Sequence, residues 1–267
     1  MSSINITKQA DVATITLNNP DKHNAFDDTM IAEMSAAFTS VEKDDSVRVV
    51  VLASEGKNFS AGGDLNWMKR MVDYDYDENL RDAQALATML NTLNNLSKPT
   101  IARVQGAAYG GAVGLVSCCD MAVASHAAKF CLSEVKIGLI PATISPYVID
   151  AIGSRAARRY FLSAEIFSAQ QALQLGLVSE VCEHNEMDQK LNTLISALLS
   201  NSPAAITASK QLVKDVSGAP IDKAMISETS KRIADVRTSS EGQEGLSAFL
   251  EKRQPAWLKQ SKHKGNE

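Results

Sequence analysis

Two glycine-rich segments in this sequence each follow an apolar run: FSAGGDL at residues 59–65 and GAAYGGA at residues 106–112. Because glycine has no Cβ, its backbone N–H can approach a ligand closely. Two such turns that meet in space can donate two N–H groups to one oxygen, which is how an oxyanion hole is built. Gly110 and Gly111 also open a helical segment, so the positive end of its dipole would face the same oxygen.

Each segment by itself also fits a tight connection between a strand and a helix that binds nothing. Neither matches the GxGxxG or Walker A pattern, so the dinucleotide-binding and P-loop classes are not indicated. The acidic residue Glu134 lies between apolar residues in CLSEVKIGL, which suits a partly buried carboxylate with a raised pKa and a role in proton transfer. A surface charge at the end of a strand is the alternative interpretation.

The elements that must position these residues alternate along the first part of the chain. Apolar and polar residues alternate from Ile4 to Leu17, which predicts two strands joined by a turn near residues 9–11. Asp27 or Asp28 then offers an N-cap to a helix. The continuous apolar run that follows is typical of a strand buried on both faces of a parallel sheet. The predicted strands and helix after the first pair span residues 47–53, 77–96 (helix), 100–106, 121–125 and, as a short strand and loop, 129–139.

Strand patterns nearly vanish after about Ile152, and helical patterns replace them. The alternation before that point favours a fold of βαβ units with one parallel sheet, and the rest predicts a helical C-terminal part. The predicted helices of that part span residues 154–164, 168–176, 187–201, 202–216 and 245–253.

The composition is that of a globular protein of 267 residues, with 45% hydrophobic and 22% charged residues and a formal net charge of -4. The acidic balance disfavours a dedicated nucleic-acid binder. No C-x-x-C pair occurs among the cysteines, so we expect buried free thiols rather than a zinc site. No apolar run is long enough to span a membrane and the N-terminus has no secretory pattern, so we expect a cytoplasmic protein.

The glycine-rich segments resemble those of a known family. FSAGGDL is similar to the F-C/S-A-G-A/G-D-L/I loop of the crotonase (enoyl-CoA hydratase/isomerase) family, and QGAAYGGAVGLVSCCDMAVAS resembles its second loop, helix and strand. Further segments match in order from about residue 10 to residue 258. The resemblance implies an α/β fold: a crotonase (ClpP-like) ββα-superhelix body over residues 1–195 with the active site, and a helical C-terminal oligomerisation region over residues 196–267. It also implies trimers or dimers of trimers.

The resemblance implies a role for each matching residue. The backbone N–H groups of Gly63 and Gly111 would form the oxyanion hole, Glu134 would transfer protons, and the Ala142 N–H would help to hold a water. A metal and a separate cofactor are not expected, because coenzyme A arrives as part of an acyl-CoA thioester substrate. Phe249 and Lys252 would reach the nucleotide end of a neighbouring subunit's substrate, although Lys252 also fits a solvated helix charge. The other implied substrate-binding residues are Lys22, Ala25, Ala61, Asp64, Leu65, Gly110 and Gly114.

One position departs from the family pattern. The common enoyl-CoA hydratases carry a second glutamate where this sequence has Gly114. We therefore expect a hydratase in which Glu134, water or another side chain supplies the second proton, with a double-bond isomerase that uses Glu134 alone as the alternative. A protein of another class, either RNA-binding or a catalytically silent member of the same fold, is a third interpretation.

Two segments resemble bacterial methylglutaconyl-CoA hydratases of leucine and isovalerate breakdown: GGDLNWMKRMVDYDYDENLRDA and CLSEVKIGLIPATISPYV. Such a substrate carries a distal carboxylate, which a desolvated pocket must pair with a donor or a cation. Lys69, Arg70 and Lys136 are the candidate cations, and each also fits a solvated surface charge. The apolar group Trp67, Met68 and Met71 fits either the wall of an acyl pocket or the core.

Overall fold

A computed structural model describes residues 2–260, in which the strands form two sheets. Met1 and residues 261–267, which belong to the predicted body and C-terminal region, lie outside the described residues. The larger sheet has six strands in the order β1-β2-β3-β4-β6-β9, and every neighbouring pair from β2 onward is parallel. Its strands span Ile4–Gln9 (β1), Val12–Leu17 (β2), Val49–Ser54 (β3), Thr100–Val104 (β4), Met121–Ser125 (β6) and Glu180–Cys182 (β9).

The second sheet is small and supports the loops near its strand ends. Its order is β5-β7-β8, with β5 parallel to β7 and β8 antiparallel to it. These strands span Ala107–Tyr109 (β5), Lys129–Cys131 (β7) and Phe167–Ser168 (β8). The second glycine-rich segment therefore begins as a strand, because its backbone pairs with residues 129–131 before the helix starts.

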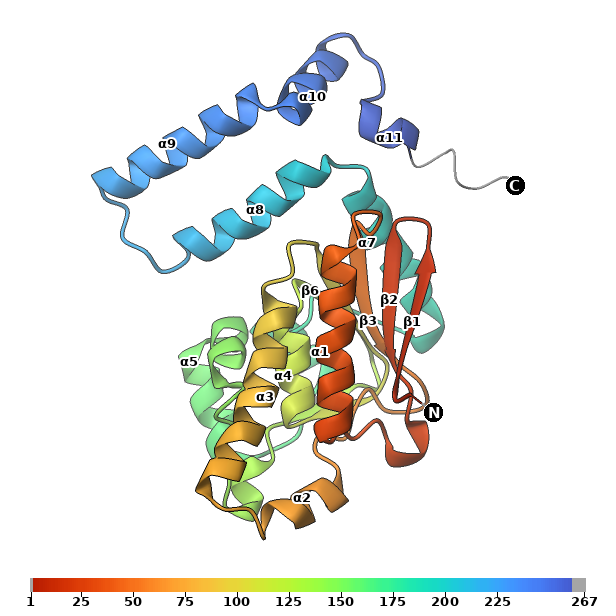
Figure 1. Cartoon of the computed structure of the whole chain (residues 1–267), viewed down its shortest axis with the longest axis vertical. Helices are drawn as coiled ribbons and strands as arrows, with labels where there is room; N and C mark the ends of the chain where they lie inside the picture. Colours follow the sequence, from red (N-terminus) through yellow and green to blue (C-terminus); the bar gives the residue numbers. More distant parts are fainter. Residues whose placement is uncertain (1, 261–267) are drawn as a thin grey trace.

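Strand β3 lies at the centre of the larger sheet, and all six of its residues are buried. Val50 and Leu52 face a core formed with the helices α1, α3, α4 and α5, whereas Val49 and Val51 face α7. The prediction of a parallel sheet covered on both faces is therefore confirmed. In Figure 1, helices α1, α3 and α4 lie side by side over one face of this sheet.

The helices and short 3-10 turns have the following bounds. The helices of the body are Asp28–Lys43 (α1), Leu65–Met71 (α2), Tyr76–Asn94 (α3), Gly111–Cys118 (α4), Ser145–Ser163 (α5), Ala169–Leu175 (α6) and Met187–Leu199 (α7). The later helices are Pro203–Val216 (α8), Lys223–Thr238 (α9), Ser240–Leu250 (α10) and Ala256–Gln260 (α11), and the turns are Pro20–Lys22 (η1), Glu134–Ile137 (η2) and His184–Glu186 (η3). Among the helices of residues 2–260, none combines the length and the apolar character that crossing a membrane requires.

Local sequence signals explain where the site-bearing helices begin. Asp27 caps α1, because its side chain accepts a hydrogen bond from Met30 N–H at 3.0 Å. Asp75 and Glu78 form a capping box at the start of α3. The expected cap of the first helix is therefore confirmed at Asp27.

Four expectations were incomplete, three of them for the second half of the chain. The larger sheet does not end before residue 152, because the short strand β9 pairs with β6. Helix α5 begins at Ser145 and continues past Gly153, whose φ of 74° and ψ of 155° separate two helical stretches. Helix α9 was not predicted, and Cys119 is only half-buried, although the cysteines at 118, 131 and 182 are buried and all four are free.

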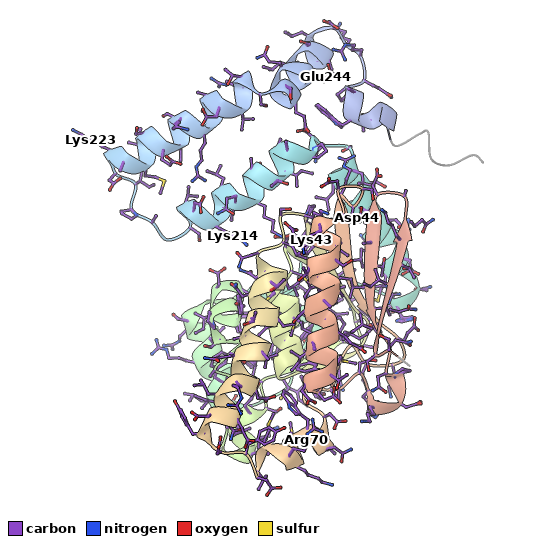
Figure 2. All side chains as sticks on the ribbon, in the orientation of Figure 1. Lys43, Asp44, Arg70, Lys214, Lys223 and Glu244 are labelled. Atoms are coloured by element: carbon purple, nitrogen blue, oxygen red, sulfur yellow. The ribbon has the colours of Figure 1, made fainter. Side chains whose placement is uncertain are left out.

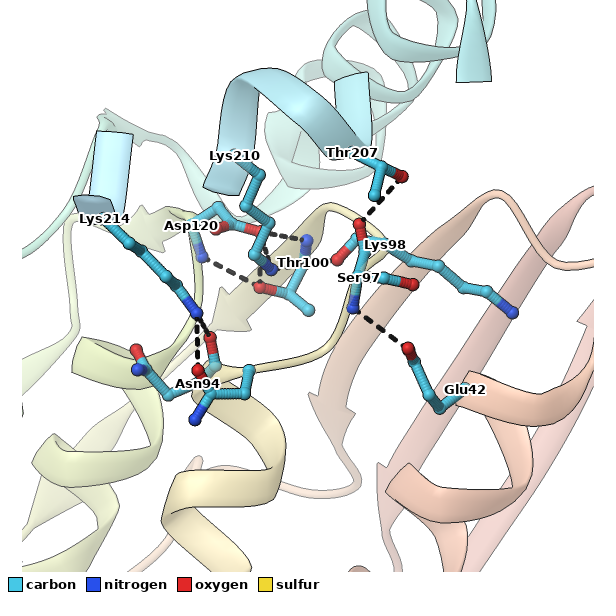
Figure 3. A network of polar contacts seen from close by, with 10 residues as sticks. Glu42, Asn94, Ser97, Lys98, Thr100, Asp120, Thr207, Lys210 and Lys214 are labelled. Carbon is cyan, nitrogen blue, oxygen red and sulfur yellow. Dashed lines mark hydrogen bonds and ion pairs between the residues drawn. The ribbon is translucent and has the colours of Figure 1, made fainter. Parts of the chain in front are cut away.

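The helices α8, α9 and α10 stand at one end of the molecule, opposite α2 (Figure 1). Helix α8 has no buried residue, so apolar burial does little to hold it on the body. Lysine contacts do so instead. Lys210 Nζ donates to Asp120 Oδ2 at 2.7 Å and to the Lys98 carbonyl at 3.0 Å, and Asp120 Oδ2 also accepts from the Thr100 N–H at 2.7 Å (Figure 3).

A second lysine of α8 binds the C-terminal end of helix α3 in the body. Lys214 Nζ donates to the Asn94 carbonyl and, at 3.0 Å, to Asn95 Oδ1 (Figure 3 labels Lys214 and Asn94). Cations that bind the last carbonyls of a helix stabilise its C-terminus. Lys214 therefore fixes α8 to the end of α3.

We expect Lys210→Met to lower the free energy of unfolding by about 1.5–3 kcal/mol, the usual range for a hydrogen bond to a charged group. The side chain of Lys210 is only 10% exposed, and its removal leaves Asp120 without its cation. Lys231→Met is the matched control, because the Lys231–Asp235 pair lies on the surface with a lysine exposure of 70% and should contribute little. Urea unfolding measures both; equal losses for the two variants would contradict this role of Lys210.

Candidate active site

The two glycine-rich segments meet through backbone hydrogen bonds. On one side of the first segment, Phe26 N–H donates to the Gly62 carbonyl at 2.9 Å and Asp64 N–H donates to the Phe26 carbonyl at 3.0 Å. On the other side, Ser60 N–H donates to the Ala107 carbonyl at 3.0 Å, which joins the two segments directly. The expectation that the two turns lie together is confirmed.

Gly63 and Gly111 both border Phe26. The backbone of Phe26 pairs with Gly63, and the tip of its ring would lie 2.5 Å from a Cβ added at Gly111. A Cβ added at Gly63 would lie 2.9 Å from Met68 Cε. At Gly111 the buried ring of Phe26 therefore opposes any side chain, whereas at Gly63 the atom in the way is the end of the flexible Met68 side chain. Within residues 2–260 neither backbone N–H has a hydrogen-bond acceptor, so both are available to a ligand oxygen.

Glu134 lies beside the second glycine-rich segment. It opens η2 after strand β7, and its Oε1 is 3.2 Å from the place that a Cβ would take at Gly110. Gly110 has a φ of 56° and a ψ of -124°, a conformation that glycine adopts without strain. Because Gly110 has no side chain, the carboxylate can approach the N-terminal end of α4.

The carboxylate of Glu134 is desolvated. Its Oε2 is buried and has no hydrogen-bond partner in the part of the chain that the structure describes. Burial raises the pKa of Glu134 above its usual value, and a hydrogen bond from its own N–H offsets this only in part. An unpaired buried carboxylate oxygen with a raised pKa is suited to accepting a proton and returning it.

Gly114 does not lie on an open surface. A Cβ at this position would be 2.3 Å from Ile144 Cγ2 and 3.6 Å from Leu90 Cδ2, and Gly114 itself is buried. Ile144, which precedes α5, is 1% exposed. The expected contact of Gly114 with the substrate stays a prediction. The space that a longer side chain at 114 would need is filled by Cγ2 and Cβ of Ile144.

The N–H of Ala142 donates to the Ile140 carbonyl at 2.8 Å, in the tight turn that leads into α5. A water would have to share this hydrogen or displace that carbonyl. The expected role of Ala142 in holding a water stays a prediction.

The residues expected to bind coenzyme A form one continuous strip. Ala61 N–H donates to the His23 carbonyl at 3.0 Å, which places the loop after η1 beside the first glycine-rich segment. Lys22 Nζ and Asp64 Oδ2 form an ion pair of 3.0 Å across this junction. Leu65 follows at the start of α2, with 73% of its side chain exposed. The structure thus brings together Lys22, Ala25, Ala61, Asp64 and Leu65, and their contacts with a ligand stay a prediction.

Asp64 has a structural task within this strip. Its Oδ1 accepts hydrogen bonds from Asn66 N–H at 2.8 Å and Trp67 N–H at 3.1 Å, which caps α2. Burial alone would raise the pKa of Asp64, but the bonds from Lys22 and the two N–H groups outweigh it and lower the pKa. Its carboxylate is therefore already engaged. Its backbone is engaged too, because its N–H donates to the Phe26 carbonyl at 3.0 Å and its carbonyl accepts from Met68 N–H at 2.9 Å.

Phe249 and Lys252 lie far from these residues in the same copy of the chain. Phe249 is on α10, at the end of the molecule opposite α2, and 81% of it is exposed. Figure 2 shows the same separation, with Glu244 of α10 at one end and Arg70 of α2 at the other. Within one copy of the chain they are therefore separated from the candidate site, and their contact with a substrate stays a prediction.

The side chains of α2 divide between the core and the surface. Trp67 is 5% exposed and belongs to the core, whereas Met68 borders Gly63. Arg70 Nη2 is paired with Asp28 Oδ1 at 2.5 Å, so it is engaged. Lys69 and Lys136 are exposed and have no ion-pair partner among the described residues.

One supporting residue was missed by the sequence analysis. Asn24 is fully buried at a φ of 53°, and its Nδ2 donates to the carbonyls of Glu55 and Asn58 at 2.8 and 3.0 Å. Asparagine tolerates this left-handed conformation better than most residues do. The signal was present as an asparagine in the polar loop NNPDKHNAF, but its partners could not be read from local pattern.

Comparisons with known proteins agree with this arrangement. The family model described as enoyl-CoA hydratase/isomerase matches residues 7–260, so the chain belongs to that family. An enoyl-CoA hydratase structure from Shewanella pealeana is 48% identical, with a TM-score of 0.93 and coverage of 96% of each chain. The crotonase fold is therefore shown.

Curated relatives include both reaction types. The 2,3-dehydroadipyl-CoA hydratase of Escherichia coli is 31% identical over 96% of this chain and 98% of its own length. The trans-2-decenoyl-[acyl-carrier-protein] isomerase of Streptococcus mutans is 31% identical over 91% of this chain and 93% of its own length.

We expect Gly114→Ala to destabilise the protein by about 1–3 kcal/mol, because the added Cβ overpacks against Ile144. Ile144→Ala alone should also destabilise it, by opening a cavity. In the double variant the two changes should compensate, so that the loss is smaller than the sum of the single losses. Urea unfolding of the four proteins measures this coupling, and additive losses would contradict the contact.

We expect the acid limb of the activity–pH profile to lie above pH 4.3, the usual pKa of glutamate. Glu134 must be ionised to accept a proton, and burial raises its pKa. The kcat/KM measured against pH reports this value. A limb at the usual glutamate pKa would contradict the assignment.

The same shift sets the sign of a stability effect. When the pKa of a carboxyl is higher in the folded than in the unfolded state, ionisation of that carboxyl lowers the free energy of unfolding. This loss of stability is absent below the unfolded-state pKa and develops as pH rises through the folded-state pKa. Glu134→Gln should therefore be at least as stable as the wild type at pH 7, while it loses most turnover. Glu55→Gln, at an exposed glutamate, is the control and should change neither property.

Proposed function

We propose that this protein adds water reversibly to an α,β-unsaturated acyl-CoA thioester. One observation carries the proposal: the desolvated carboxylate of Glu134 lies beside the segment whose Gly111 N–H, like that of Gly63, lacks an acceptor among the described residues. A charge-stabilising pair of donors next to a proton acceptor is the arrangement that enolate chemistry needs.

The proposed reaction proceeds in two proton movements. As a water oxygen attacks Cβ of the substrate, Glu134 accepts a proton from that water and negative charge moves onto the thioester oxygen. The N–H groups of Gly63 and Gly111 stabilise this charge, and each such donor typically contributes about 3–4 kcal/mol. Glu134 then returns the proton to Cα, so that one water has been added and the carboxylate is regenerated. No cofactor other than the coenzyme A of the substrate takes part.

An isomerase is the second candidate, and the contact between Ile144 and Gly114 favours it. Because this contact leaves no room for a second carboxylate at position 114, Glu134 would move a proton between two carbons of the acyl chain without consuming water. The similarity to the Streptococcus mutans isomerase supports the same alternative.

We further propose 3-methylglutaconyl-CoA as the substrate, in leucine or isovalerate degradation. The resemblance of residues 62–83 and 131–148 to methylglutaconyl-CoA hydratases supports it, and the Escherichia coli relative is also named for a thioester of a dicarboxylic acid. Since Arg70 is already paired with Asp28, the unpaired Lys69 and Lys136 are the better partners for a distal carboxylate.

We also propose that the protein works as a trimer or a dimer of trimers. Phe249 and Lys252 then bind the nucleotide end of the substrate held by a neighbouring copy. The exposure of Phe249 at the end opposite α2 supports this arrangement.

A screen of crotonyl-, 3-methylcrotonyl- and 3-methylglutaconyl-CoA tests the reaction and the substrate together. Hydration removes the absorbance of the conjugated enoyl group and adds the mass of one water, whereas isomerisation changes no mass. We expect the highest kcat/KM with 3-methylglutaconyl-CoA. Lys69→Met or Lys136→Met should raise KM for that substrate about tenfold and leave KM for crotonyl-CoA unchanged. Absence of any water adduct would reject the hydratase.

A further inference from the structure

Helix α2 follows Gly63 directly and is only seven residues long. Trp67 is its one buried residue, so packing alone gives this helix little support. Its N-terminus is capped by Asp64, and its C-terminal Arg70 is paired with Asp28 of α1. A third bond, from Trp67 Nε1 to Asp82 Oδ1 at 3.1 Å, joins it to α3.

The indole of Trp67 lies on the side of Gly63 where a side chain would stand. Its Cε3 and Cζ3 atoms would lie 3.6 Å from a Cβ at Gly63, which is ordinary van der Waals contact. A rotation of the indole would therefore change the packing on this side of Gly63. Because the other edge of the ring carries the N–H that Asp82 accepts, Asp82 sets the angle of the indole.

The position of Asp82 beside Trp67 desolvates its carboxylate, which costs free energy. It is half-buried, and burial and the nearby Asp28 raise its pKa, while the bond from Trp67 and the charge of Arg70 lower it by less. A carboxylate on an exposed helix face would avoid this desolvation. A hydrogen bond to a charged acceptor in a partly desolvated setting is stronger and more directional than a neutral one.

We propose that Asp82 is a positioning residue for the reaction: by holding the Trp67 indole against Gly63, it fixes the orientation of the Gly63 N–H. The inference rests on the proposed function, in which that N–H stabilises the charge of the transition state. A donor that acts on developing charge affects kcat more than KM. Small misplacements of such a group reduce turnover strongly.

Trp67 reports its own position by fluorescence once Trp257 is replaced, because the chain has 2 tryptophans. In a Trp257→Phe background, Asp82→Ala should shift the emission of Trp67 to longer wavelength and increase its quenching by iodide. The same change should lower kcat about tenfold or more while KM changes less than about twofold. Asp82→Asn, which keeps the acceptor oxygen, should restore both the emission and kcat.

Two further variants separate positioning from a general loss of stability. Asp77→Ala, at an exposed carboxylate of the same helix, is the matched control and should leave emission and kcat unchanged. Trp67→Phe keeps the ring but removes the N–H, so it should lower kcat by itself, and adding Asp82→Ala to it should cause no further loss. An additional loss in that double variant, or an Asp82→Ala protein with unchanged emission and kcat, would overturn the proposal.

The fluorescence measurement tests the role of Asp82 separately from the proposed function. If the wild-type protein neither hydrates nor isomerises any enoyl thioester, the proposed function is wrong. In that case the emission of the Asp82→Ala protein alone decides whether Asp82 holds Trp67, and an unshifted spectrum overturns it.

Discussion

The close contact of two backbone segments, possible only where a Cβ is missing, is the constraint on which the site depends. Phe26 pairs with the first glycine-rich segment, and that segment pairs with the second, so three stretches of chain share one small junction. A Cβ at Gly62 of the first segment would lie 2.8 Å from the Tyr109 carbonyl oxygen of the second. Gly63 and Gly111, whose N–H groups have no acceptor among the described residues, lie next to this contact, so the packing of the loops places the candidate chemistry.

Desolvation decides what the acid beside this junction can do. Glu134 lies against Gly110, where a larger residue would push it away, and its second oxygen is buried without a partner among the described residues. The raised pKa follows from this burial, because water no longer stabilises the charged form. Ile144 adds an apolar boundary at Gly114, so packing as well as sequence opposes a second carboxylate at position 114.

The two ends of the molecule are built on different principles. The body buries β3 on both faces between helices, so apolar packing defines it. Helix α8 buries no residue and is held by lysines that bond to Asp120 and to the carbonyl end of α3. These hydrogen bonds fix the orientation of α8 with little apolar burial. The surfaces of α9 and α10 remain exposed. Those surfaces are where the proposed neighbouring copy would bind.

The sequence by itself determined the features that are local along the chain. The alternation of apolar residues predicted the first strand pair, and a continuous apolar run predicted β3. Asp27 or Asp28 marked the start of α1, and the two glycine-rich turns with Glu134 indicated the family. Short strands such as β9 were not predicted, because three residues carry no reliable period. Only the tertiary structure decided which side chain fills the space beside each glycine: Phe26, Glu134 and Ile144 reach α4 from distant parts of the chain. It also decided that the Ala142 N–H donates to the Ile140 carbonyl, because the path of a turn depends on the elements that it joins.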